Sequence, residues 1–506
     1  MLLKKIPLNI YIIFITFLLL STYTFNAKLD LNGDNASYYI FAKSLATGHG
    51  YSDLSAPGNP PSSTFPPGYS LLMAPIFWIT DSIEVQNYFG EIFLLASVIL
   101  LYFFIATSLK NKGLALFTSI IILSNFFILQ FATMMMSELP YMLFSIGVLW
   151  YLLKVNEQSK TNKFDFILLI LITVFAYHIR TQGVVLLLSI VIHFLLNKKW
   201  KNAIFTILGF ALGSLPWILR NKFLKLEGSR YLTQIMLTDQ LDPEKGTLPI
   251  AEVIARIIGQ SWDIITKELP RTIYSYFIED YANNIFYPIL GVILFIIILY
   301  GSWKFIKLRW FFVSFVIGNI LIMGIWSGKG FENRYLICIL PILLFCFYYG
   351  ITSIFQQIFK NEIKSNLVWI PASIIMLLVQ FKDIKFLHDW NIEQYPETYA
   401  NFFNVAEWAK NNIPEKSIVS VRKPALFYVY SNRKSVNYLY SEDTKKVIED
   451  MVKSKVDYVI VDALEYSTTY KFLIPAIKKH SNQFRESYSI GNPAFFLLQF
   501  DKQLPR

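Results

Sequence analysis

The residues best suited to chemistry lie in a polar loop that follows the first long apolar run. The loop carries Asp30 and Asp34, and Asp34 directly precedes the segment 35–47, which is predicted to form a short amphipathic helix. A carboxylate held here can act as a general base on a hydroxyl or amine, worth roughly 10²–10⁴ in rate. Asp34 can instead simply cap the helix at 35–47, as Asp often does. Asp30 is either a second carboxylate of the site or a solvated loop residue.

A second acid, Glu138, lies in the sequence Ser137-Glu138-Leu139-Pro140 at the start of a later apolar run. A charged side chain costs about 2.5–3.5 kcal/mol at the centre of a bilayer, so one at the end of a span needs a partner or a function. The same pattern is also typical of a plain helix start, with the acid at the positive end of the helix dipole. The functional interpretation is that Glu138 positions an acceptor or a divalent metal; the sequence leaves metal dependence open.

Three arginines border apolar runs at the same predicted side of the membrane: Arg180, Arg220 and Arg334. Guanidinium groups bind phosphate in a bidentate manner and keep their charge, so these three are the candidates for holding a phosphate. Each can instead extend its charged end to the membrane interface without binding anything. Arg230 and Lys329 are weaker candidates.

The composition places the chain in a membrane. Of 506 residues, 54% are hydrophobic, 17% are aromatic and only 16% are charged, which is too apolar for a soluble protein. The net charge of +11 follows from lysines in short loops, as expected of cytoplasmic loops, and no basic patch interleaved with aromatics indicates nucleic-acid binding. The two cysteines, Cys338 and Cys346, would lie about 12 Å apart along a helix, too far for a disulfide.

Hydropathy predicts an α-helical polytopic membrane protein with eleven spans. The run at 6–25 is predicted to be retained as the first span. The stretch 165–197 is broken by Arg180-Thr-Gln-Gly183, and two crossings are favoured over one long helix. The apolar piece 71–80 is too short to span and is interpreted as interfacial. The other predicted spans are 88–109, 113–131, 138–153, 202–219, 285–303, 310–326, 334–351 and 366–382.

One orientation places all short basic loops in the cytoplasm, with the N-terminus inside and the C-terminus outside. Outer loops then cover residues 26–87 and 220–284, within a membrane domain of residues 1–384. Residues 385–506 form an extracytoplasmic α/β domain, called the tail here, in which no catalytic motif is found. Its predicted elements are helices at 399–412, 444–453 and 469–480 and strands at 417–421, 456–462 and 494–500.

Over about residues 1–350 several short motifs follow one another in a definite order. Asp34 and the helix at 35–47 are followed by Gly48-His-Gly50-Tyr51, Pro66-Pro-Gly-Tyr69, Glu138, Trp217-Ile-Leu-Arg220-Asn221 and Arg334-Tyr335-Leu336. This order resembles the GT-C glycosyltransferases, in particular protein O-mannosyltransferases and aminoarabinose transferases. The family often has a second acid directly after the first, where this chain has Asn35.

The resemblance implies an integral cell-membrane enzyme that moves a sugar from a polyprenyl-phosphate carrier to an extracytoplasmic acceptor, with inversion. It implies that Asp34 is the catalytic carboxylate, that the arginines hold the carrier phosphate and that the carrier tail lies between helices open to lipid. It identifies no certain cofactor and leaves a divalent metal as an option. The sugar, the acceptor (envelope lipid, glycan or protein) and the carrier, undecaprenyl or dolichyl phosphate, stay open.

Two other classes of protein would also place charges at membrane depth. A transporter or lipid flippase commonly has two related halves with broken helices at matching positions, and no internal repeat is found here. A non-catalytic envelope-assembly subunit would keep the scaffold without the activity.

Overall fold

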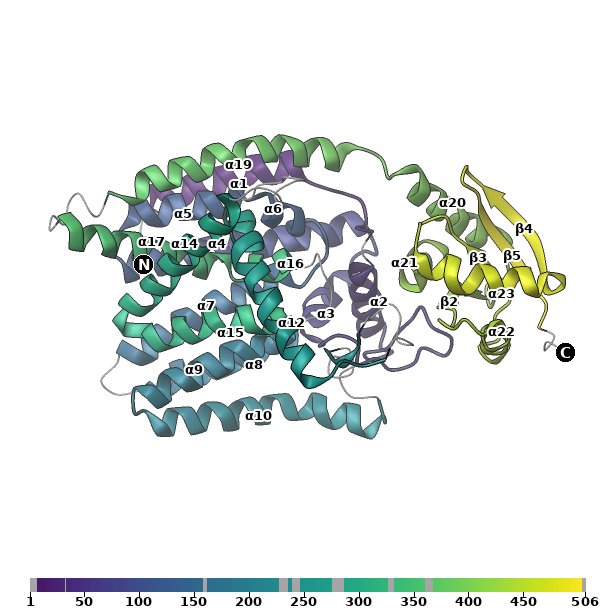
Figure 1. Cartoon of the computed structure of the whole chain (residues 1–506), viewed down its shortest axis with the longest axis horizontal. Coiled ribbons are helices and arrows are strands. Elements are labelled where there is room, and N and C mark those ends of the chain that lie inside the picture. Colours follow the sequence, from purple (N-terminus) through teal and green to yellow (C-terminus); the bar gives the residue numbers. More distant parts are fainter. Residues whose placement is uncertain are drawn as a thin grey trace.

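Apolar helices packed side by side form the larger part of the molecule, and the tail lies at one end of them (Figure 1). The computed structural model describes residues 7–31, 33–157, 162–226, 235–238, 246–274, 286–325, 332–359 and 367–502. Among these residues, six helical segments are long and apolar enough to cross a membrane, or seven if a bent pair counts as one span. The six are α4 (Ile83–Ser108), α7 (Glu138–Glu157), α10 (Trp200–Phe223), α14 (Phe286–Lys304), α15 (Arg309–Ile325) with the preceding turn, and α17 (Leu340–Phe359).

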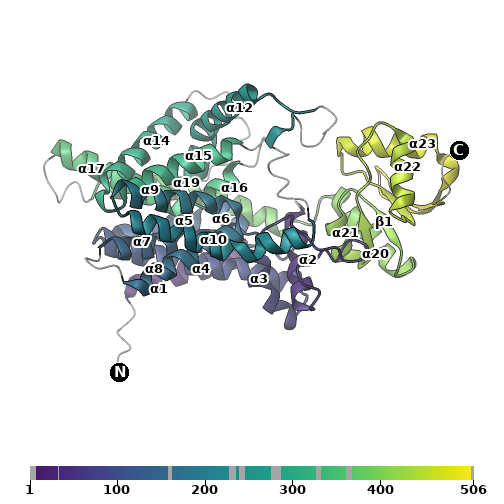
Figure 2. The same ribbon diagram turned by 90° about the horizontal axis from the view of Figure 1, so that it is seen from below.

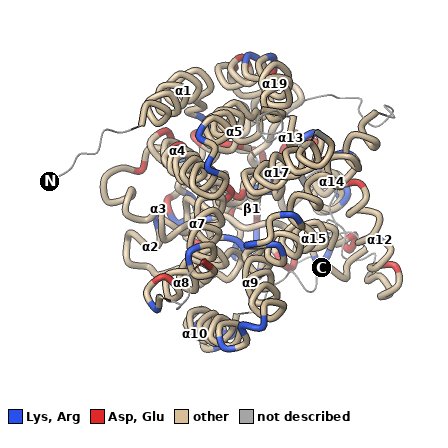
Figure 3. The backbone as a smooth tube through the Cα atoms, turned by 90° about the vertical axis from the view of Figure 1, so that its left-hand side faces the viewer, with Lys and Arg blue, Asp and Glu red and all other residues tan. Residues whose placement is uncertain are grey.

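The other predicted spans are helical as well. They form the shorter helices α1 (Leu8–Thr24), α8 (Lys163–Ile179) and α9 (Val184–Leu196), and the long helix α19 (Trp369–Ile392), which runs alongside α1 (Figure 1). Within the described residues, each predicted span is helical over most of its length, and the number that cross the membrane stays a prediction. Figure 3 views the helices from the end opposite the tail and shows Lys and Arg gathered at the helix ends there.

Close backbone contacts pack the helices where small residues allow them, as is common in membranes. Gly301 of α14 faces Gly350 of α17, and a Cβ on Gly301 would lie 1.9 Å from the carbonyl oxygen of Cys346. By contrast, α10 keeps large apolar side chains such as Leu212 on its surface, where Leu212 is 68% exposed. That surface is suited to lipid rather than to water.

Two predicted spans are not single helices. The segment 113–131 is broken into α5 (Lys112–Ser124) and α6 (Phe126–Ala132), bent by 64°. Asn125 causes the break, because its side chain caps α6 at Ile128 and donates to the carbonyl of Thr272 at 2.8 Å. The segment 334–351 is divided into α16 (Glu332–Ile337) and α17, whose second residue is Pro341.

The predicted break at Arg180 is present. Arg180 has an extended backbone between α8 and the short turn η2 (Thr181–Gly183), and α10 packs against both α8 and α9. The piece 71–80, predicted as interfacial, forms α3 (Gly68–Met73) and η1 (Ala74–Trp78); its depth in the membrane stays a prediction.

The tail is an α/β layer structure, as predicted. Its five strands are ordered β2-β1-β3-β5-β4, with β1 parallel to β2 and β3, and β5 antiparallel to β3 and β4. The strands are β1 (Ile418–Ser420), β2 (Lys434–Val436), β3 (Tyr458–Val461), β4 (Phe484–Ile490) and β5 (Phe495–Phe500), and the helices are α20 (Glu397–Asn412), α21 (Pro424–Ser431), α22 (Thr444–Lys453) and α23 (Ile474–Lys479). The segments α21, β2 and β4 were not predicted.

The tail contacts the first outer loop directly, and Figure 2 shows α21 beside α2 (Asp34–Ala46). Lys434 of β2 donates to the carbonyl of Leu54 and to the side chain of Asn59, both at 2.6 Å. The backbone N–H of Ser435 donates to the carbonyl of Ser55 at 2.8 Å. The loop that carries Asp34 is therefore held between the membrane helices and the tail.

Candidate functional site

Four of the predicted site residues meet in one charged network, although they come from four distant segments. Arg334 of α16 lies 2.8 Å from the carboxylate of Asp34, the first residue of α2, and also pairs with Glu138 of α7. Arg180, at the break after α8, lies 2.7 Å from the same Glu138 oxygen. The network therefore alternates acid and base, and its four formal charges cancel, which lowers the cost of burying them.

Burial is greatest at Glu138, in the middle of the network, and falls through Arg334 to Asp34 at one end. The side chain of Glu138 is 0% exposed, Arg180 8%, Arg334 16% and Asp34 36%. Glu138 is thus the buried anchor that fixes both guanidinium groups. Asp34 lies at the accessible end, where a substrate can reach it.

Local backbone geometry sets the position of Asp34. Gly33 is the N-cap of α2 and has φ +96°, a left-handed conformation that favours glycine. Asp34 is consequently the first residue inside the helix, and its carboxylate turns to Arg334. Asp34 does not cap α2 in this structure, because Gly33 occupies the N-cap position.

Hydroxyl and aromatic groups support the arginines. Ser137 accepts hydrogen bonds from Arg180 at 3.0 Å and from the buried Tyr38 hydroxyl at 3.2 Å, and the ring of Tyr335 lies 5.1 Å from the Arg180 guanidinium. Sequence reasoning missed the roles of Ser137 and Tyr38, although both lie within the motifs that marked the site. Among the described residues, Glu138 Oε2 and the buried Tyr69 hydroxyl have no hydrogen-bond partner.

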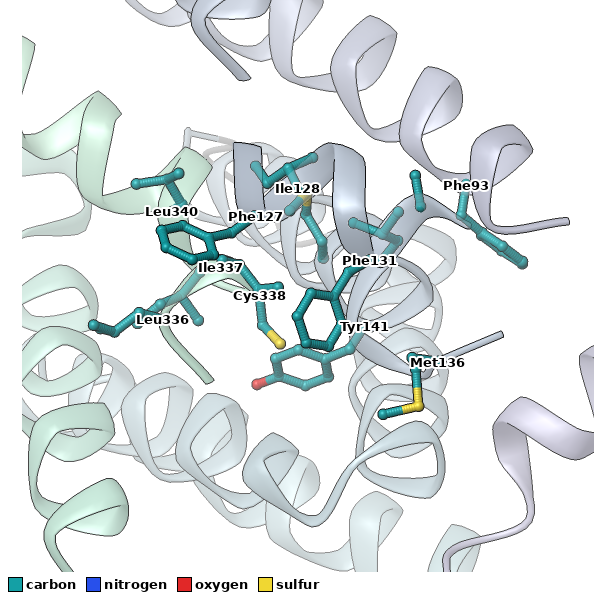
Figure 4. Close-up of a cluster of buried hydrophobic side chains, with 14 of the residues drawn as sticks. Phe93, Phe127, Ile128, Phe131, Met136, Tyr141, Leu336, Ile337, Cys338 and Leu340 are labelled. Carbon is teal, nitrogen blue, oxygen red and sulfur yellow. The ribbon is translucent and has the colours of Figure 1, made fainter. Parts of the chain in front are cut away.

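An apolar layer next to the network holds α16 in place. Figure 4 shows Ile337 and Cys338, which follow Arg334 by a few residues, beside Phe127, Phe131 and Tyr141. The Cys338 thiol also bonds to the carbonyl of Arg334 at 3.3 Å. Residues of α6 and α7 therefore fix the short helix that carries Arg334.

Arg220 has different partners from the other two arginines. Its guanidinium donates to the carbonyls of Ser62 at 2.9 Å and Tyr51 at 2.7 Å, and it stacks 4.7 Å from the ring of Trp217. In this structure Arg220 thus ties the end of α10 to the first outer loop. Its predicted phosphate contact stays a prediction.

Asp30 lies toward the tail. Its backbone carbonyl accepts a hydrogen bond from the side chain of Asn35 at 3.0 Å. Burial and then neighbouring groups, the Asp30 charge among them, raise the pKa of Tyr399 in α20. The role of Asp30 as a second carboxylate stays a prediction.

Arg230, Lys329 and much of the outer loop at 220–284 lie outside the described residues. Within the part of the chain that the structure describes, no group of three or more His, Cys, Asp or Glu side chains is placed to hold a metal ion. The carboxylates of Asp34 and Glu138 face guanidinium groups instead.

An apolar groove of about 510 Å³ lies between α1 and α19, lined by Thr16, Leu19, Leu20, Tyr23, Ser124, Phe381, Ile384 and Lys385. None of these residues belongs to the charged network. The network is therefore the better candidate site, because it combines an accessible carboxylate with two guanidinium groups.

Comparisons with known proteins bear on the fold. A family model described as a domain of unknown function (DUF8201) matches residues 77–225, and no curated protein matches the sequence significantly. Two solved structures of ArnT from Cupriavidus metallidurans are similar over nearly the whole chain. The one bound to undecaprenyl phosphate has a TM-score of 0.57 at 9% identity, covering 97% of both chains. The apo structure has a TM-score of 0.55 at 9% identity, covering 98% of this chain and 99% of that one.

A third structure, the arabinofuranosyltransferase AftD from Mycobacteria, has a TM-score of 0.50 at 12% identity, covering 97% of this chain and 40% of that one. At such low identity these likenesses concern the fold. The fold expected from the resemblance in sequence is therefore confirmed, because this chain folds like ArnT and AftD, which are GT-C membrane glycosyltransferases.

Proposed function

We propose that the protein is an inverting glycosyltransferase that moves a sugar from a polyprenyl-phosphate carrier to an extracytoplasmic acceptor. The observation that carries the proposal is the network of Asp34, Glu138, Arg180 and Arg334 in a fold like that of ArnT. One of the ArnT structures has undecaprenyl phosphate bound, and this supports a carrier of the same class for this protein.

In this proposal Arg180 and Arg334 hold the carrier phosphate. A guanidinium has five N–H donors, and the pairs with Glu138 and Asp34 use only part of those on Arg334. Because Glu138 is fully buried between the two arginines, it keeps both in a fixed orientation for a bidentate contact. When the carrier phosphate binds the Arg334 guanidinium, it competes with the Asp34 carboxylate for that positive charge. The Asp34 carboxylate is then available as a base.

The reaction is a single displacement. The acceptor oxygen or nitrogen forms a bond to the anomeric carbon while the bond from that carbon to the phosphate oxygen breaks. The electron pair of the broken bond leaves with the phosphate, whose charge the arginines balance, and Asp34 takes the proton of the nucleophile. One displacement inverts the configuration at the anomeric carbon.

The rival functions do not use Asp34 in this way. A transporter or flippase, or an assembly subunit, has no nucleophile to activate. A partly exposed carboxylate at the accessible end of a buried network favours the enzyme. Removal of the Asp34 carboxylate should therefore abolish sugar transfer without abolishing binding of the carrier lipid.

The proposed orientation has the N-terminus in the cytoplasm and the tail outside, so that the network lies at the extracytoplasmic membrane surface. Reporter fusions at Lys199, just before α10, and after Asp389, near the end of α19, should give opposite signals because an odd number of crossings separates them. Alkaline phosphatase and green fluorescent protein fusions measure this. Matching signals at both points would mean that the number of spans between them is wrong.

The donor class can be tested by binding. Purified protein in nanodiscs should bind undecaprenyl phosphate more tightly than undecaprenol, and Arg180→Gln should weaken phosphate binding by about tenfold or more, the value of a charge-assisted hydrogen bond. Arg309→Gln is the matched control, because Arg309 stacks on Trp303 outside the network. Equal binding of the two lipids would contradict the proposed donor.

A further inference from the structure

The tail presents a second polar cluster at the carboxyl ends of its parallel strands. Ligands of α/β sheets commonly bind outside these strand ends, because loops from neighbouring strands meet there. Arg422 and Lys423 follow β1, Tyr440 follows β2 and Tyr466 follows β3. Together with Tyr399 of α20 these residues form what we call the carboxyl-edge cluster, and all five are partly exposed.

Arg422 is held in a fixed orientation with its terminal nitrogens available. Its guanidinium lies 4.6 Å from the ring centre of Tyr466 and 5.5 Å from that of Tyr440, and its Nε donates to Thr468 Oγ1 at 3.0 Å. Among the described residues, neither terminal nitrogen of Arg422 has a hydrogen-bond partner, and no carboxylate lies within salt-bridge distance of it. Such a fork is suited to bidentate contact with a carboxylate or phosphate.

Basic groups dominate the potential at Tyr466. Burial alone would raise the pKa of its phenol, but its hydrogen bonds with Lys423 and Tyr399 and the charges of Lys423 and Arg422 lower the pKa overall. Two acids also act on the cluster, because the charges of Asp30 and Asp462 contribute to the raised pKa of Tyr399; Asp462 accepts a hydrogen bond from the backbone N–H of Leu464 at 3.2 Å. An anionic ligand would therefore be attracted to this position.

The cluster lies next to the candidate active site. Lys423 donates a hydrogen bond to the carbonyl of Leu31, and Tyr395 donates to the carbonyl of Leu29 at 2.9 Å. Leu31 is only three residues before Asp34, a stretch that spans at most about 10 Å. A saccharide bound at the cluster could thus extend to the Asp34 carboxylate.

We propose that the carboxyl-edge cluster is the acceptor subsite and that it binds an anionic saccharide through Arg422, with the tyrosine rings packed on the sugar. This inference rests on the proposed function, since it names the class of acceptor for the same site. The anionic group is either a phosphate or a carboxylate.

Saturation-transfer NMR on the full chain in nanodiscs tests the inference with three probes: glucose 6-phosphate, glucuronate and glucose. At least one of the two anionic sugars should bind about tenfold or more tightly than glucose. Tighter binding of glucose 6-phosphate assigns a phosphorylated acceptor, and tighter binding of glucuronate assigns an acidic sugar.

Arg422→Gln should reduce this binding to the level of glucose, and Arg422→Lys, which keeps the charge but not the fork, should retain part of it. Lys502→Gln is the matched control, because Lys502 pairs with Asp457 at 2.7 Å near the opposite, amino ends of β1 and β3. It removes the same charge from the same domain and should leave binding unchanged, which also shows that charge loss alone does not unfold the tail.

Two results would overturn the inference: glucose binding as tightly as both anionic sugars, or Arg422→Gln binding them as tightly as the wild type does. The measurement needs no transfer reaction, so it is independent of catalysis. If the wild-type protein binds the anionic sugars but does not bind undecaprenyl phosphate, the result would instead contradict the proposed function.

Discussion

Replacement of Asp34 by Asn should lower turnover by about 10²–10⁴, the value of general-base catalysis, in a protein that still folds and binds carrier lipid. Asn keeps the size and much of the hydrogen bonding, but it cannot accept the proton of the nucleophile. Asp34 is 36% exposed and Arg334 keeps its second partner, Glu138, so the stability cost should stay below the about 3–5 kcal/mol of breaking a fully buried pair. The assay is transfer from donor lipid extracted from native membranes, normalised to folded protein.

Asp81→Asn is the matched control for this experiment. Asp81 also pairs with a cation, Lys43, at 2.7 Å, but it is 57% exposed and lies outside the network. Its loss should leave turnover nearly unchanged. Because Gly33 occupies the N-cap, a purely structural Asp34 would contribute only a helix-end effect of about 0.3–1 kcal/mol, and Asp34→Asn would then behave like the control.

Replacement of Arg334 by Gln should have the second large effect, on both donor use and stability. Arg334 contacts Asp34 and the fully buried Glu138, so its removal leaves Glu138 with a single cationic partner. Breaking a buried pair in this way costs about 3–5 kcal/mol. We expect the KM for the lipid-linked donor to rise by about tenfold or more, because a charge-assisted contact with phosphate is lost.

The KM separates this role from a purely structural one. Arg334→Lys restores the charge without the fork, so it should recover stability more fully than donor use. A donor KM equal to that of the wild type, measured on the folded fraction of Arg334→Gln, would remove Arg334 from the phosphate site.

Most of the helices could be predicted because runs of apolar residues of membrane length leave few alternatives. The breaks were harder. Asn125 is one polar residue in a long apolar run, and only its distant partner, the carbonyl of Thr272, shows that it ends one helix and starts another. In the tail, β4 was missed because its sequence, FRESYSI, is largely exposed and lacks the apolar signal of a buried strand.

The residues of the candidate site could be predicted from their types, but that they meet in one network could be predicted only in part. Charged residues at the ends of apolar runs are costly, so Asp34, Glu138, Arg180 and Arg334 were recognisable one by one. Their convergence depends on contacts across as many as 300 residues, as between Asp34 and Arg334. Arg220 also lies at the end of an apolar run, but it donates to loop carbonyls. No local sequence pattern distinguishes it from the arginines of the network.

The most direct test of the glycosyltransferase proposal is mass spectrometry of envelope lipids and glycans in a strain that lacks this protein. We expect one sugar to be missing from its acceptor and the lipid-linked form of that sugar to accumulate. The wild-type chain should restore the modification, and Asp34→Asn, present in normal amount, should not. Unchanged lipids and glycans in the deletion strain, or full restoration by Asp34→Asn, would contradict the account.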